Sequence, residues 1–133
     1  MKKNLFPLAT VLLFCICLFS ACSRQHRYRI HDDNLDLTVL ESNSIYKLNA
    51  DYNEDKTGAV QRYINQSIEP GKLFSSAEDF FDGSAELKDH TRFHLTSSPG
   101  KLEIKLNKRE NSYAAYTRIK SMCEGIAGIL KEQ

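Results

Sequence analysis

The stretch RFHLTSSPGKLEIKLN, residues 92–107, carries the clearest β-hairpin pattern of the chain and decides the fold. Apolar and polar residues alternate on both sides of a central Ser-Ser-Pro-Gly turn, as expected for two strands with one buried face. Proline and glycine favour reversal of the chain at this turn. A two-residue loop would place Phe93 opposite Leu106 and a four-residue loop would place it opposite Ile104, and both keep the apolar residues on one face. The sequence therefore predicts an antiparallel hairpin, with its first strand starting as early as Leu87.

An earlier hairpin is predicted by the same alternation. It covers residues 35–52, on either side of the polar turn at 42–44. A two-residue loop would place Asp36 opposite Asp51, whereas a four-residue loop places Asp36 opposite Asn49 and avoids the like-charge pair. We therefore predict the four-residue loop.

A helical pattern follows each hairpin. The first helix is expected to begin at Asp55 or Thr57 and to end before Pro70, and the second covers residues 113–131. The segment 72–86 has a weaker pattern and is predicted to be a connector held by its aromatic residues. The resulting β-β-α-β-β-α order predicts an α+β domain, a four-stranded antiparallel sheet with two helices on one face and the strand order left open.

The two halves of this predicted order also share a short stretch of identical sequence. Lys47-Leu48-Asn49 is answered by Lys105-Leu106-Asn107, and each half reads strand, strand, helix. Gly125 and Gly128 lie inside the second helix, where each costs about 1 kcal/mol relative to alanine. Their presence predicts close packing of this helix against a neighbouring element.

The N-terminus has the pattern of a secretion signal. Residues 1–4 form a short positive leader, and residues 5–19 form an apolar core of 15 residues interrupted only by a proline and a threonine. A permanent membrane span needs about 20 apolar residues, so this core is short. It ends in Ser20-Ala21-Cys22. Residues 1–22 therefore resemble the signal of bacterial lipoproteins, in which two small residues precede the cysteine that becomes the mature N-terminus. An uncleaved anchor helix is the alternative.

The resemblance implies a lipid anchor. In lipoproteins the cysteine sulfur carries a diacylglycerol and the new amine is usually acylated, commonly with palmitate, which assigns lipidation to Cys22. Two or three chains hold a protein firmly on a bilayer. Ser23 in place of aspartate implies the outer membrane of the cell envelope, facing the periplasm. The expected organisation is a signal peptide at 1–21, a lipid anchor and basic tether at 22–34, and a single α+β domain at 35–133.

The composition expected after cleavage argues against a disulfide and against a nucleic-acid partner. Cleavage would leave Cys123 as the one cysteine besides the anchor, so no disulfide within the domain is expected, and the apolar helical pattern around Cys123 predicts a buried thiol. Loss of Lys2 and Lys3 leaves 16 basic against 17 acidic residues, a formal charge near −1. This balance argues against a nucleic-acid partner.

One face of the predicted sheet carries no helix, and basic residues of the second hairpin gather on it. They are Lys88, His90, Arg92, His94 and Lys105. We interpret them as a candidate docking face for an anionic protein partner in the cell envelope. A merely solvated sheet face would also be polar and is the alternative.

Motifs for catalysis and metal binding are missing from the sequence. His90 and His94 would lie about 13 Å apart along a strand, too far to hold one ion, and no nucleophile elbow is present. We therefore expect no enzyme, no cofactor and no metal, but a non-enzymatic interaction or structural module, such as an accessory lipoprotein of a secretion or surface-assembly machine. The alternative is a lipoprotein that binds a small ligand between the sheet, the last helix and Phe74, Phe80 and Phe81; an enzyme ranks third.

Overall fold

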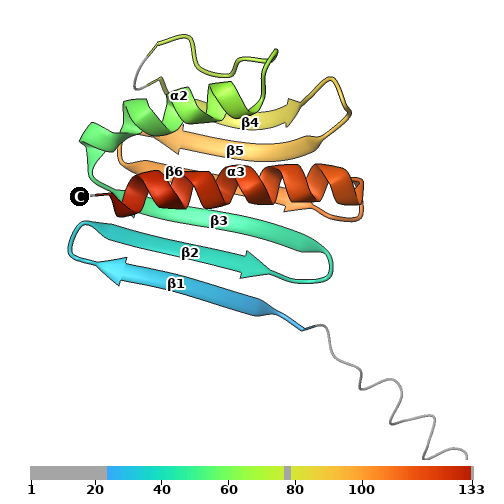
Figure 1. Cartoon of the computed structure of the whole chain (residues 1–133), viewed down its shortest axis with the longest axis horizontal. Coiled ribbons are helices and arrows are strands. Elements are labelled where there is room, and N and C mark those ends of the chain that lie inside the picture. Colours follow the sequence, from blue (N-terminus) through green and yellow to red (C-terminus); the bar gives the residue numbers. More distant parts are fainter. Residues whose placement is uncertain (1–23, 77–78, 133) are drawn as a thin grey trace, which may run out of the picture.

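One antiparallel sheet organises the chain in the computed structural model, which describes residues 24–76 and 79–132. Within those residues the element order is β-β-β-α-β-β-β-α, and the strands lie side by side in the order β1-β2-β3-β6-β5-β4 (Figure 1). The strands are β1 (His26–Asp32), β2 (Leu35–Glu41), β3 (Ile45–Tyr52), β4 (Phe81–Glu86), β5 (Arg92–Ser98) and β6 (Lys101–Asn107). A 3-10 turn η1 (Glu54–Lys56) leads into α2 (Thr57–Ser67), and α3 (Tyr113–Lys131) ends the fold.

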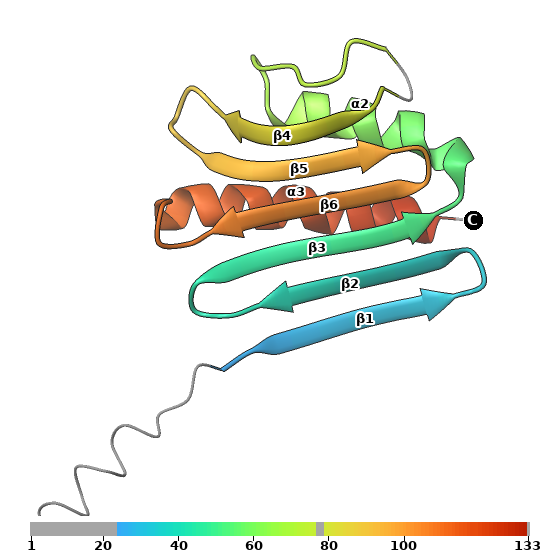
Figure 2. The same ribbon diagram turned by 180° about the vertical axis from the view of Figure 1, so that it is seen from behind.

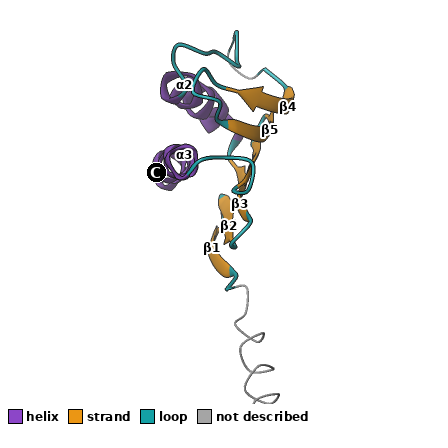
Figure 3. Cartoon of the chain, turned by 90° about the vertical axis from the view of Figure 1, so that its right-hand side faces the viewer, coloured by secondary structure: helices purple, strands orange, loops and turns teal. Residues whose placement is uncertain are grey.

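Both helices pack on one face of the sheet, as predicted (Figure 3). The alternating apolar residues of the central strands point toward the helices, and Leu48 and Ile104 are fully buried there in one core cluster with Ile126 of α3. The helices approach each other closely at Gly125, where a Cβ atom would lie 1.8 Å from the Tyr63 hydroxyl of α2. This contact confirms the predicted close packing at Gly125. At Gly128 an added Cβ would meet nothing within 4 Å, so the expectation was wrong there.

The sheet has six strands within the described residues instead of the predicted four. Strand β1 occupies residues expected to form the tether, and β4 occupies residues expected to form a connector. Both are edge strands in which most side chains of β1 and the outward side chains of β4 are exposed, so the apolar alternation that predicted the inner strands is weak in them. Antiparallel pairing with β2 and β5, the strands that follow them in the chain, holds them in place.

The β2–β3 hairpin has the two-residue loop, so the predicted four-residue loop was wrong. Asp36 does lie opposite Asp51. The strands that flank this hairpin supply cations to both carboxylates, because Arg29 of β1 pairs with Asp36 at 2.7 Å and Lys101 of β6 pairs with Asp51 at 3.6 Å. In the β5–β6 hairpin Leu95 lies opposite Ile104, which corresponds to the two-residue loop.

The two halves of the chain meet at the centre of the sheet, between β3 and β6 (Figure 2). Of the residues that the two halves share, Lys47 lies directly opposite its counterpart Lys105. The Lys47 ammonium lies 3.6 Å from the Glu103 carboxylate, which offsets the like charge. The strand order is therefore symmetric about the β3–β6 pair, with β1, β2 and β3 on one side matched by β4, β5 and β6 on the other.

The segment predicted to be a lipoprotein signal, including Cys22, lies outside the described residues. Among the residues that are described, no helix is long and apolar enough to cross a membrane.

Candidate functional site

The outer face of the sheet, opposite the helices, faces the viewer in Figure 2. It carries paired charges rather than a uniform basic surface. The pairs join neighbouring strands at nitrogen–oxygen distances of 2.7 to 3.6 Å: Arg29–Asp36, Lys47–Glu103, Lys101–Asp51, Arg92–Glu86 and His94–Asp82. Exposed pairs of this kind add little stability each. Their effect is to make the net charge of most of this face small.

Three of the five predicted docking residues come together on this face. Arg92, His94 and Lys105 line a shallow hollow of about 570 Å³. Lys88 and His90 do not belong to it, because the chain turns between β4 and β5: the His90 amide donates to the Leu87 carbonyl at 2.9 Å, and His90 has a φ of 64°. The continuous strand predicted from Leu87 onward was therefore wrong.

Strand β4 adds acidic residues that the sequence reasoning did not place here. Glu86 accepts from the Arg92 Nε at 3.1 Å, and Asp82 lies 3.0 Å from the His94 Nε2. Hydrogen bonds from His90 and Arg92 lower the pKa of the Glu86 carboxyl. An anionic partner at Arg92 or His94 would therefore compete with carboxylates already in place.

The helical face is incompletely covered at the β1 end of the sheet. The helix α3 lies over the middle strands, and β1 and β2 extend beyond it (Figures 1 and 3). Tyr28 on this side of β1 is 55% exposed. Between the two strands and α3 lies a hollow of about 350 Å³, lined among others by Tyr28, Val39, Ala127 and Lys131. Apolar surface is thus open to an incoming segment at this end.

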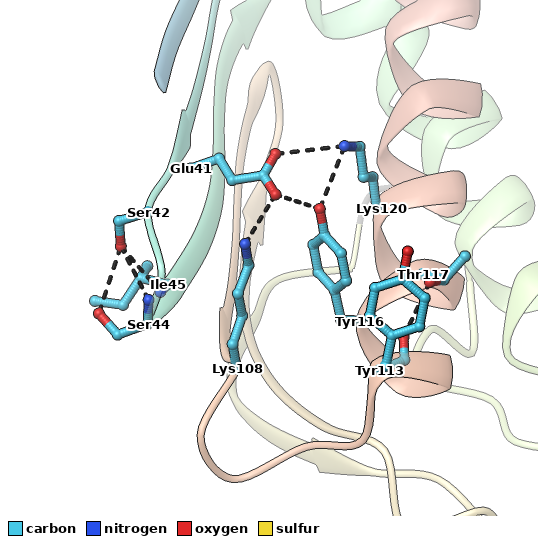
Figure 4. A network of polar contacts seen from close by, with 9 residues as sticks. All are labelled: Glu41, Ser42, Ser44, Ile45, Lys108, Tyr113, Tyr116, Thr117 and Lys120. Atoms are coloured by element: carbon cyan, nitrogen blue, oxygen red, sulfur yellow. Dashed lines mark hydrogen bonds and ion pairs between the residues drawn. The ribbon is translucent and has the colours of Figure 1, made fainter. Parts of the chain in front are cut away.

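Glu41, Lys108, Tyr116 and Lys120 form a half-buried polar cluster (Figure 4). Two of its members, Glu41 and Lys120, line this hollow. The Lys108 Nζ donates to Glu41 at 2.8 Å, Lys120 lies 3.4 Å from its other oxygen, and the Tyr116 hydroxyl also donates to it. Burial by itself would raise the pKa of Glu41, but the hydrogen bonds from Lys108 and Tyr116 outweigh it and lower this pKa to about 2. The cluster ties the end of β2 to α3 and holds Glu41 ionised at neutral pH.

The β1 edge, meaning the backbone of His26–Asp32 on the side away from β2, has no neighbouring strand within the described chain. The β1–β2 ladder pairs all seven residues without interruption. Every second β1 residue therefore directs its N–H and C=O groups away from the sheet. An edge of this kind can accept a further strand.

Cys123 is buried in the core, as predicted. It is 1% exposed, and burial raises the pKa of its thiol to about 12. A thiol in this state is not a nucleophile at neutral pH. Across residues 24–76 and 79–132, no group of three or more histidine, cysteine or acidic side chains is placed to hold a metal ion.

Comparisons with known proteins assign no family to this chain. No protein-family model matches the chain, and neither the curated proteins nor the solved structures contain a match.

Proposed function

We propose that this chain is a lipid-anchored protein of the bacterial cell envelope that acts as a non-enzymatic interaction module, as an accessory lipoprotein of a secretion or surface-assembly machine would. The anchor is Cys22, and the membrane is the outer membrane, with the domain in the periplasm. The proposed partner is another envelope protein.

The observation that carries this proposal is the open β1 edge, which follows the predicted anchor closely in the sequence. The strand begins at His26, four residues after Cys22. Four extended residues span at most about 14 Å, so the edge would be held near the membrane surface. A module in this position can bring a partner segment to the membrane without any chemistry of its own.

A small-ligand function has less support. Its predicted pocket was to lie among Phe74, Phe80 and Phe81, but Phe74 is 2% exposed and fills this region, packed edge-to-face on Phe81 with ring centroids 6.0 Å apart. Phe80 is 71% exposed and points away from the core. We therefore propose the interaction module.

The test is covalent crosslinking in intact cells followed by purification of a C-terminally tagged chain and mass spectrometry. The matched control is Cys22→Ala, which removes the site of lipid attachment. One or a few envelope proteins captured by the wild type and lost with Cys22→Ala would support the proposal. The same bulk membrane proteins in both samples would contradict it.

A further inference from the structure

We infer that the β1 edge binds an extended segment of the partner as an added strand, and that this segment alternates acidic with apolar side chains. The inference rests on the proposed function and deepens it by naming the binding mode and the chemistry of the partner. Four observations support it: the direction of the backbone groups of β1, the charge of its outer side chains, the apolar surface on its inner side, and the way the opposite end of the sheet is completed.

The backbone of β1 presents three residues to the open edge. The Ser42 amide donates to the Ile45 carbonyl at 2.9 Å, so this pair closes the β2–β3 hairpin and the even-numbered residues of β2 bond to β3. The odd-numbered residues of β2 then bond to β1, where their partners are even-numbered, such as Tyr28 opposite Val39. The N–H and C=O groups of Arg27, Arg29 and His31 consequently point outward.

The side chains of these same three residues lie on the outer face of the sheet and carry the basic character of β1. Asp36 fixes Arg29, since the Nε and Nη2 atoms of Arg29 donate to the two carboxylate oxygens of Asp36 at 3.2 and 2.7 Å. His31 also lies 3.6 Å from Asp36. Arg27 faces Leu40 and has no ion pair within the described residues. An incoming strand would therefore meet an uncompensated cation at Arg27.

The other end of the sheet shows how such a strand is completed. There β5 carries Arg92 and His94 on the outer face, and the neighbouring edge strand β4 supplies Glu86 and Asp82 to them. The inward side chains of β4 are apolar or absent, as at Ala85, which is buried. β1 repeats the basic pattern of β5 but lacks the acidic strand beside it.

The inner side of β1 matches the apolar half of the proposed pattern. Tyr28 and Ile30 lie on this side: Tyr28 is exposed and lines the hollow between the strands and α3, and Ile30 is half-buried against the core. Side chains of an added strand that point the same way would cover them. Alternation of acid and apolar residues would thus satisfy both faces at once.

Two other arrangements fit the surface less well. The β4 edge is itself acidic on its outer side, where it carries Asp82 and Glu86. A second copy of the chain, pairing its β1 with this β1 in the centred antiparallel register, would place one Arg29 opposite the other. Like charges opposed in this way destabilise the pairing.

The test uses the full chain purified in detergent and a fluorescent nine-residue peptide in which valine alternates with glutamate and serine, with its lysine counterpart as control. Binding is followed by fluorescence anisotropy, and the contact is located by hydrogen exchange. We expect the glutamate peptide to bind, to protect residues 26–32, and to outcompete the lysine peptide. Absence of binding at millimolar peptide, or protection at β4 instead, would overturn the inference.

Two variants of Arg27 distinguish the contribution of its backbone N–H to peptide binding from the contribution of its side-chain charge. Arg27→Pro removes both the outward N–H and the guanidinium, whereas Arg27→Ala removes only the guanidinium. A strand-addition mode predicts that Arg27→Pro binds the peptide about tenfold more weakly than Arg27→Ala, because an interstrand hydrogen bond is lost and the edge geometry is disturbed. Equal affinities would overturn it. His31→Pro, also at an outward position, repeats the comparison against His31→Ala if Arg27→Pro fails to fold.

Two further readouts keep the outcomes apart. Arg27→Glu should reverse the preference between the two peptides, and an unchanged preference would refute the acidic chemistry. Protection of β1 that rises with protein concentration in the absence of peptide would point to a second copy of the chain and overturn the inference. Failure here leaves the Cys22-dependent crosslinking result standing, so the binding mode and the proposed function are tested separately.

Discussion

Glu41 offers a direct test of how the β2 end of the sheet is held to α3. Its side chain is 23% exposed and that of its partner Lys108 is 19% exposed. The folded protein lowers the pKa of Glu41 from 4.5 to about 2. Each unit of pKa difference between the folded and unfolded states corresponds to about 1.4 kcal/mol, so this shift corresponds to roughly 3 kcal/mol of folding free energy. Glu41→Gln should therefore destabilise the domain by an amount of that order at neutral pH.

The pH dependence of this loss has a definite sign. Because the pKa of Glu41 is lower in the folded state, the unfolded chain takes up the proton first as the pH falls. The stabilisation is present in full above about pH 4.5 and disappears as the pH approaches 2. The stabilities of the wild type and Glu41→Gln should therefore converge between pH 5 and pH 2.

Urea unfolding followed by circular dichroism at several pH values, in a Cys22→Ala background, measures both effects. Glu103→Gln is a matched control, since Glu103 is 38% exposed and its ion pair with Lys47 spans 3.6 Å. This control should lose much less stability. A Glu41→Gln variant as stable as the wild type at pH 7, or a difference that stays constant down to pH 2, would refute the assignment.

Three further predictions concern the helices. Gly125→Ala should destabilise the domain by about 1–3 kcal/mol, because the new methyl group would overlap Tyr63. Gly128→Ala should instead stabilise the domain by up to about 1 kcal/mol. The same unfolding assay checks both variants, and equal effects would contradict the packing described. Thr57→Val should cost about 1–2 kcal/mol, because the buried Thr57 hydroxyl accepts a hydrogen bond at 2.9 Å from an amide of the β5–β6 turn. Cys123 should react with maleimide only after unfolding, since its thiol is buried with a pKa raised to about 12; rapid labelling of the native protein would show that the core is open.

The central part of the fold could be predicted because its information is local. Strands β2, β3, β5 and β6 each have one face against the helices, so their apolar residues alternate, and α2 and α3 have apolar stripes. Edge strands lack this requirement. β1 reads HRYRIHD and β4 reads FDGSAE, and both alternate only weakly, because the inward apolar residues are Tyr28 and Ile30 in β1 and the small Gly83 and Ala85 beside Phe81 in β4.

The predictions of the β2–β3 register and of a basic outer face were wrong for one common reason. The Asp36–Asp51 pair argued against the two-residue loop only while Arg29 and Lys101 were unknown neighbours. In the same way, the outer face looked basic at Arg92 while the acids of β4 were unplaced. Charges contributed by adjacent strands cannot be read from one hairpin alone.

The Glu41 cluster carried no sequence signal at all. Its members Lys108, Tyr116 and Lys120 lie 67, 75 and 79 residues away from Glu41. They meet only because β3 pairs with β6 and α3 returns across the sheet. Prediction of such a cluster requires the strand order, which the sequence left open.

The junction of β3 and β6 makes the sheet equivalent to a dimer contained in one chain. Lys47 lies opposite Lys105 at its centre, and the strand order is symmetric about this junction, as it is about the two-fold axis of an isologous dimer. Covalent linkage through residues 68–80 replaces a bimolecular encounter with a high effective concentration of one half near the other. The fold therefore owes its independence from protein concentration to this linker, and cutting the chain within it would make assembly of the sheet a second-order process.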